Sequence, residues 1–102
     1  MSGRLVRLKR RYVAVKPSSN ASPENVSDAV RQCFFELYGK TGFSQSGLRK
    51  GTAGSTVFFS CYSEWVPKLV LAISLVREVG GVRTVLKTVG VSGTVSGLKK
   101  HL

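Results

Sequence analysis

The sequence predicts an α+β fold in which two helices cover one face of a four-stranded antiparallel sheet. Three observations predict it. Short segments at 11–15 and 56–62 alternate in the way strands do, a segment between them has the 3.6-residue period of an amphipathic helix, and a second helical segment precedes a last alternating run. The 102 residues are 42% hydrophobic, which is enough apolar material for the core of one domain.

The first predicted strand, residues 11–15, has the sequence RYVAV. Alternation places Val13 and Val15 on one face and Tyr12 and Ala14 on the other. The next segment, 16–21, is polar and contains proline, as expected for a loop.

Helix signals follow that loop. Ser22 is a typical N-cap, Pro23 suits the first helical position, and Glu24 lies where the helix dipole favours a carboxylate. The predicted buried stripe consists of Val26, Ala29, Val30, Cys33, Phe34 and Leu37. We expect Gly39 and Gly42 to end this helix in a turn.

The second half is predicted to repeat the pattern. We expect a polar strand at 43–49, a hairpin loop at 50–55 and a strand at 56–62. A helix should begin near residues 65–67 and end at Gly80 and Gly81. The last strand should span 82–91. The buried stripe of this second helix would hold Leu69, Val70, Ile73, Val76 and Val79.

The resulting order is β-α-β-β-α-β, which is the ferredoxin-like order that RRM domains also have. In an RRM the uncovered face of the sheet binds RNA through aromatic side chains on the central strands. Alternation along 56–62 means that only one of Phe58 and Phe59 can face the core, and Tyr62 shares the face of Phe58. The aromatic motif typical of RRM domains is absent, so these rings could also contact the core or a protein.

The charge balance points to a polyanionic partner. Sixteen Lys and Arg residues face five Asp and Glu residues, which gives a formal net charge of +11. The cations concentrate near the N-terminus, at 49–50 and at the C-terminus. No basic amphipathic helix is present to favour a membrane, so a nucleic acid is the expected partner. The alternative is a surface that is basic only for solubility.

Catalytic and metal-binding residues are poorly supplied. His101 is the single histidine, the five acids form no obvious pair, and Cys33 and Cys61 have no zinc-site spacing. Both thiols are expected to be buried. The glycines of 90–97 match neither a dinucleotide-binding nor a P-loop pattern. We therefore expect no catalytic residue, no metal ligand and no cofactor on the protein.

Four segments carry a resemblance to a known family. They are VRLKRRYV at 6–13, LYGKTG at 37–42, SCY at 60–62 and VGVSGTV at 89–95. Together they resemble the small RRM-like protein subunit of ribonuclease P, which eukaryotes share with RNase MRP. The resemblance covers nearly the whole chain.

This resemblance implies a non-catalytic subunit of a ribozyme. In that family the RNA removes the 5′ leader of precursor tRNA with bound Mg²⁺, and the protein supports the RNA's catalytic domain. The implied partners are ribonuclease P RNA, precursor tRNA indirectly through that RNA, and a TIM-barrel-like protein subunit. A homodimer within a heterotetramer is also compatible with it, and no membrane partner is expected.

The resemblance also gives the basic residues a role. Arginine suits bidentate contact with phosphate, so cations at the start of the first strand would neutralise densely packed RNA phosphates. The predicted RNA contacts are Arg4, Arg7, Lys9, Arg10, Arg11, Tyr12, Arg49, Lys50, Lys99 and Lys100.

The implied organisation is a single RRM-like domain over 1–102, with a basic arm at 1–10 and a short tail at 92–102. The acidic C-terminal extension of many eukaryotic relatives does not occur in this sequence, which favours an archaeal-type, cytoplasmic subunit over a nuclear or nucleolar one. Residues 69–76 form the longest apolar stretch and are too few to span a bilayer, and the charged N-terminus is unlike a signal peptide.

Three alternatives remain at this stage. The first is a generic RRM-like RNA-binding or ribosomal protein. The second is an acylphosphatase-like hydrolase, which has the same element order but needs an Arg and an Asn beside a glycine-containing turn; the only asparagines here are Asn20 and Asn25. The third is a protein scaffold whose basic arm is not needed for assembly.

Overall fold

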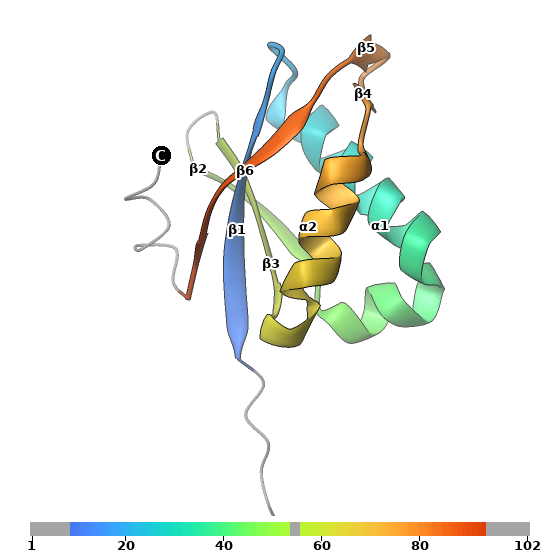
Figure 1. The fold of residues 1–102 in the computed structure, drawn as a ribbon, viewed down its shortest axis with the longest axis vertical. Helices are drawn as coiled ribbons and strands as arrows, with labels where there is room; N and C mark the ends of the chain where they lie inside the picture. Colours follow the sequence, from blue (N-terminus) through green and yellow to red (C-terminus); the bar gives the residue numbers. More distant parts are fainter. Residues whose placement is uncertain (1–8, 54–55, 94–102) are drawn as a thin grey trace, which may run out of the picture.

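The predicted two-layer arrangement is confirmed in the computed structural model, which describes residues 9–53 and 56–93. Helices α1 (Pro23–Ser46) and α2 (Val66–Leu75) lie on the same side of a four-stranded antiparallel sheet of order β2-β3-β1-β6 (Figure 1). The strands are β1 (Arg10–Pro17), β2 (Arg49–Ala53), β3 (Thr56–Tyr62) and β6 (Leu86–Ser92). This is the strand order of a ferredoxin-like fold, with β1 and β3 in the centre.

Helix α1 begins as predicted. The Ser22 hydroxyl accepts a hydrogen bond from the Asn25 backbone N–H at 3.2 Å, and Pro23 occupies the first turn. Both features satisfy or remove backbone donors that the first turn would otherwise leave unpaired.

The predicted helix break is confirmed at Gly39, whereas Gly42 lies inside a second helical part. Gly39 interrupts α1 with φ 70° and ψ −175°, and the chain then resumes a helical path to Ser46. A positive φ is strained for residues other than glycine. Gly39 therefore permits the kink that joins the two helical parts of α1. The second part is held by aromatic packing, with the rings of Phe43 and Phe34 6.1 Å apart. Leu37, predicted on the buried stripe, is 43% exposed just before the kink.

The predicted strand at 43–49 is therefore wrong, and the strand lies in the segment predicted as a loop. Strand β2 pairs antiparallel with β3, with Arg49 opposite Ser60 and Gly51 opposite Phe58. Pairing with a strong neighbouring strand outweighs the low strand propensity of the Lys-Gly-Thr sequence.

The second helical unit begins as predicted but ends early. A 3-10 turn, η1 (Ser63–Trp65), leads into α2, which stops at Leu75. A small hairpin of β4 (Glu78–Val79) and β5 (Val82–Arg83) follows, so the predicted strand at 82–91 is divided into β5 and β6. Buried Thr84 lies at the break and is bound by the Ser19 hydroxyl at 2.9 Å.

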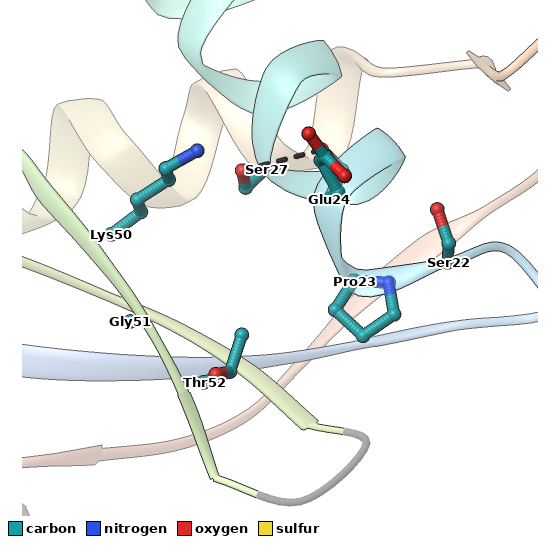
Figure 2. A pocket seen from close by; sticks show the side chains of 7 residues that line it. All are labelled: Ser22, Pro23, Glu24, Ser27, Lys50, Gly51 and Thr52. Atoms are coloured by element: carbon teal, nitrogen blue, oxygen red, sulfur yellow. Dashed lines mark hydrogen bonds between the residues drawn. The ribbon is translucent and has the colours of Figure 1, made fainter.

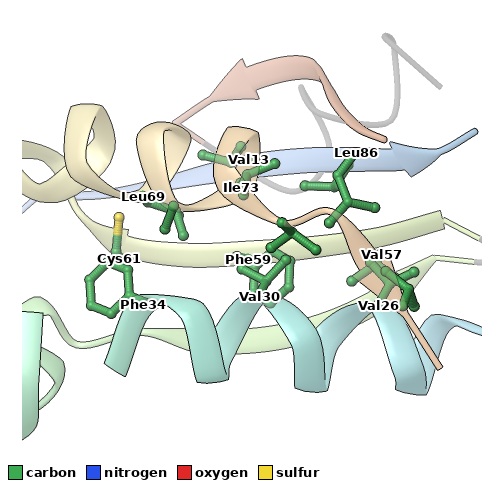
Figure 3. Close-up of a cluster of buried hydrophobic side chains, with 14 residues drawn as sticks. Val13, Val26, Val30, Phe34, Val57, Phe59, Cys61, Leu69, Ile73 and Leu86 are labelled. Atoms are coloured by element: carbon green, nitrogen blue, oxygen red, sulfur yellow. The ribbon is translucent and has the colours of Figure 1, made fainter. Parts of the chain in front are cut away.

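The core lies between the helices and the covered face of the sheet (Figure 3). Val13 and Val15 of β1 and Phe59 of β3 are fully buried there, which assigns Phe59 to the core and leaves Phe58 on the other face. Cys61 is buried as expected, whereas Cys33 is only half-buried. No helix in the described ranges is long and apolar enough to cross a membrane.

Phe34 connects the aromatic side chains of both helical units. Its ring centroid lies 4.8 Å from that of Tyr38 and 5.9 Å from that of Trp65, and the side chain is fully buried. We predict that Phe34→Ala lowers the free energy of unfolding by about 3–5 kcal/mol, since it removes these contacts and leaves a cavity. The neighbouring Phe35→Ala is the control, because Phe35 is 49% exposed and should cost about 1 kcal/mol or less. Urea unfolding measures both; equal losses would contradict the core assignment.

Candidate nucleic-acid interface

The carboxylates are confined to the helical layer and its hairpin, where Arg31, Lys40, Lys68, Arg77 and Arg83 balance them in number, whereas the sheet carries only cations. All five carboxylates of the chain belong to α1, η1 and β4: Glu24, Asp28, Glu36, Glu64 and Glu78. The four strands of the sheet contain no acidic residue and hold the cations Arg10, Arg11, Lys16, Arg49, Lys50 and Lys87. The sheet is therefore the layer of the described structure that favours a polyanion.

The face of the sheet turned away from the helices is called the open face below. Its members follow from the alternation along β1 and from the cross-strand register. They are Arg10, Tyr12, Ala14 and Lys16 of β1, Thr56, Phe58, Ser60 and Tyr62 of β3, Arg49 and Gly51 of β2, and Lys87, Gly90 and Ser92 of β6.

An aromatic pair occupies the middle of the open face. The rings of Tyr12 and Phe58 contact edge to face, with centroids 6.2 Å apart and an interplanar angle of 66°. The Phe58 ring lies over Gly51 of β2, where an added Cβ would come within 2.5 Å of the ring. Glycine at this position is thus what lets Phe58 lie across the neighbouring strand.

The partly exposed Arg10 side chain is bound by other residues of the protein. Its Nη2 donates hydrogen bonds to the Gly47 carbonyl and, at 2.8 Å, to the Ser60 hydroxyl. Its Cζ lies 5.1 Å from the centroid of the Tyr62 ring, a cation–π distance. Arg10 therefore ties β1 and β3 to the end of α1, and an RNA contact by the same side chain stays a prediction.

The other predicted contacts do not form one patch. Exposed Arg49 lies on the open face, whereas Arg11, opposite buried Cys61, and Lys50 lie on the helix side of the sheet. Lys9 is exposed just before β1. Arg4, Arg7, Lys99 and Lys100 lie outside the described residues.

A pair of lysines on the open face was not among the predicted RNA contacts. Lys16 and Lys87 stand directly opposite each other on β1 and β6, and both are exposed. Like charges in register repel, and a bound anion would relieve that repulsion. The alternation of β1 could have placed Lys16 beside Tyr12, but its partner depends on a register shift in β6 opposite Ala14 and Val15.

A hollow lies on the helix side, between the start of α1 and β2 (Figure 2). Lys50 and Thr52 point from β2 toward the first turn of α1, where Glu24 and Ser27 complete the lining. The Ser27 hydroxyl donates to the Glu24 backbone carbonyl at 3.3 Å, and no histidine or thiol is among the lining residues. The hollow thus has no nucleophile paired with a base.

The described residues offer no metal centre, since they contain no group of three or more His, Cys, Asp or Glu side chains close enough to hold an ion. Burial raises the pKa of the Cys61 thiol to about 11, although the Arg10 cation opposes this rise. Burial and the nearby Glu36 carboxylate likewise raise the pKa of Cys33. Both thiols are therefore protonated at neutral pH and are poor nucleophiles.

Comparison with known proteins agrees with this picture. Residues 11–102 match the model of the Rpp14/Pop5 family. The chain is 33% identical over 98 residues to ribonuclease P protein component 2 of Archaeoglobus fulgidus, covering 93% of this chain and 89% of that protein. It is 32% identical over 100 residues to the same component of Pyrococcus horikoshii, covering 93% and 83%.

A chain in a cryo-EM structure of yeast ribonuclease MRP has a similar fold. The TM-score is 0.64 at 10% sequence identity, and the match covers 89% of this chain and 79% of that chain. This likeness concerns the fold alone.

The two open-face arginines should respond differently to truncation. We predict that Arg10→Ala lowers the free energy of unfolding by about 1–3 kcal/mol, because it removes two hydrogen bonds and a cation–π contact. The matched variant Arg49→Ala should change it by no more than about 0.5 kcal/mol, since Arg49 is exposed. Urea unfolding of both variants checks this; no loss of stability in Arg10→Ala would show that its bonds are not structural.

Proposed function

The chain belongs to the Rpp14/Pop5 family, and from this membership we propose that it is a protein subunit of ribonuclease P that binds the enzyme's RNA in precursor-tRNA maturation. The archaeal relatives named above are ribonuclease P components, and the match covers 89% and 83% of their lengths. The observation in the structure that supports RNA binding most strongly is the charge distribution: the sheet carries six cations and no carboxylate, whereas on the helical layer and its hairpin cations and carboxylates are equal in number.

In this proposal the protein contributes binding and leaves the cleavage to the RNA. Arg49, Lys16 and Lys87 lie on the open face and would neutralise phosphates that an RNA fold brings close together. The Mg²⁺ ions for cleavage would stay on the RNA, and precursor tRNA would be reached through it. The acylphosphatase-like alternative gains no support, because the chain matches the Rpp14/Pop5 family and archaeal ribonuclease P components instead.

The helical layer suits a protein partner instead. Leu71 and Leu75 are 50% and 43% exposed and, four residues apart, share one face of α2. This layer also carries the carboxylates, which would repel RNA. We propose that the TIM-barrel-like ribonuclease P subunit docks on this face of α2 while the sheet contacts RNA.

Reconstitution tests the proposed function. Ribonuclease P RNA, the TIM-barrel-like subunit and the protein are combined, and precursor-tRNA cleavage is followed at limiting Mg²⁺ with protein-only controls. The wild-type protein should restore cleavage, and a triple variant with Lys16→Ala, Arg49→Ala and Lys87→Ala should need at least about tenfold more protein. Its dependence on log salt should also become shallower by roughly 2–3 units, close to one for each lost phosphate contact.

A matched triple variant keeps the same charge change off the sheet. Lys40→Ala, Arg77→Ala and Arg83→Ala remove three exposed cations from α1 and the region of the small hairpin. This control should behave like the wild-type protein. Equal loss in both triple variants would contradict an RNA interface on the sheet, and cleavage by the protein alone would contradict a non-catalytic subunit.

A further inference from the structure

We propose that the open face binds an unpaired nucleotide, whose base stacks on Phe58 beside Tyr12 and whose phosphate is bound by Arg49. This inference rests on the proposed function and deepens it. The central aromatic pair would select single-stranded RNA, whereas the cations alone could bind any phosphate backbone.

Small side chains surround Phe58, whose ring is partly exposed, whereas Ala14 beside it is fully buried. Gly51 of β2 and Ala14 of β1 are the cross-strand neighbours of Phe58 on this face, and Gly90 of β6 lies opposite Ala14 one strand further along the same row. None of them has a side chain larger than a methyl group. The Phe58 ring lies low over Gly51, so it forms part of a shallow surface rather than a projecting knob.

The next row supplies a second ring and a cation. Tyr12 stands between Ser60 and Ser92 in this row, and Arg49 is opposite Ser60 at the edge strand. A base over Phe58 would thus have the Tyr12 ring beside it. Aromatic rings that accept bases one at a time are the usual means by which sheets bind single strands.

Arg49 is available for a phosphate, in contrast to Arg10. Within the part of the chain that the structure describes, the Arg49 side chain is exposed and makes no hydrogen bond or ion pair, whereas the Arg10 side chain is held by Gly47, Ser60 and Tyr62. Across the sheet, Lys16 and Lys87 give the following phosphates a second cationic contact. The strand would therefore run from β2 across the aromatic pair to β6.

Charge and ring geometry favour a single strand over the other possible occupants. A double helix keeps its base faces stacked inside and can offer the open face only phosphate and sugar. An apolar protein surface would cover Arg49, Lys16 and Lys87 without supplying partners for them, and burial of unpaired charges is unfavourable. A single-stranded nucleotide satisfies both features, because its base stacks on the rings and its phosphate pairs with the cations.

The test uses a short oligouridylate with one 2-aminopurine and the same oligonucleotide with an abasic site at that position. Wild-type protein should quench the 2-aminopurine fluorescence and bind the intact oligonucleotide about tenfold more tightly than the abasic one. Phe58→Ala should abolish the quenching and the preference, whereas Tyr12→Phe should retain both. Phe35→Ala is the control, since it removes an exposed ring from α1. Far-UV circular dichroism verifies that each variant is folded.

Equal affinity for the intact and abasic oligonucleotides would overturn the inference, as would an equal loss of binding in Phe35→Ala. Reconstituted cleavage separates this failure from failure of the proposed function. If the cation variants impair cleavage but the base preference is absent, the subunit contacts RNA through phosphates only. If the preference is present but the protein has no effect on cleavage, the stacking site exists and the ribonuclease P role is wrong.

Discussion

The register of β1 between β3 and β6 is the constraint on which the rest of the structure depends. Pairing Val13 with Phe59 and Val15 with Val57 sends these side chains to the helices, and the same pairing sends Tyr12 and Lys16 to the open face. A slip by one residue would exchange the two sets, placing a lysine in the core and valines in solvent. The hydrophobic core and the candidate RNA surface are therefore fixed by one and the same choice of register.

Charge separation gives the two layers different chemistry. The carboxylates occupy the helical units and the small hairpin, and Leu71 and Leu75 are exposed on α2. The strands of the four-stranded sheet carry only cations among their charged residues. Nonspecific attraction brings RNA to so basic a molecule but does not by itself select the side on which the RNA binds. Confining the negative charges to one layer orients the protein on the RNA and leaves the other layer for a protein.

The sequence correctly predicted the features that depend on neighbouring residues, such as helix caps and strand alternation. Ser22 and Pro23 marked the start of α1, and alternation identified β1 and β3 and hence the element order. The wrong predictions lie between Gly39 and Ala53 and between Val76 and Val85, where contacts between residues far apart in the sequence determine the structure. Local sequence patterns do not reveal that Phe43 packs against Phe34 or that β2 pairs with β3.

The candidate site shows the same division. Alternation placed Tyr12 and Phe58 on one face, but the use of Arg10 to bind Gly47, 37 positions away, and the opposition of Lys16 to Lys87 arise only when the sheet is assembled. A basic segment in a sequence therefore contains both side chains that stabilise the fold and side chains that are available to bind RNA. The strand register of the assembled sheet distinguishes the two kinds.

The most direct test of the account is site-specific photo-crosslinking in the assembled enzyme. Benzoylphenylalanine replaces Thr56 on the open face in one protein and Leu71 on α2 in another. The account predicts that the label at 56 joins to the RNA and the label at 71 joins to a protein subunit. Crosslinks from 56 to protein and from 71 to RNA would show that the two layers have the opposite partners.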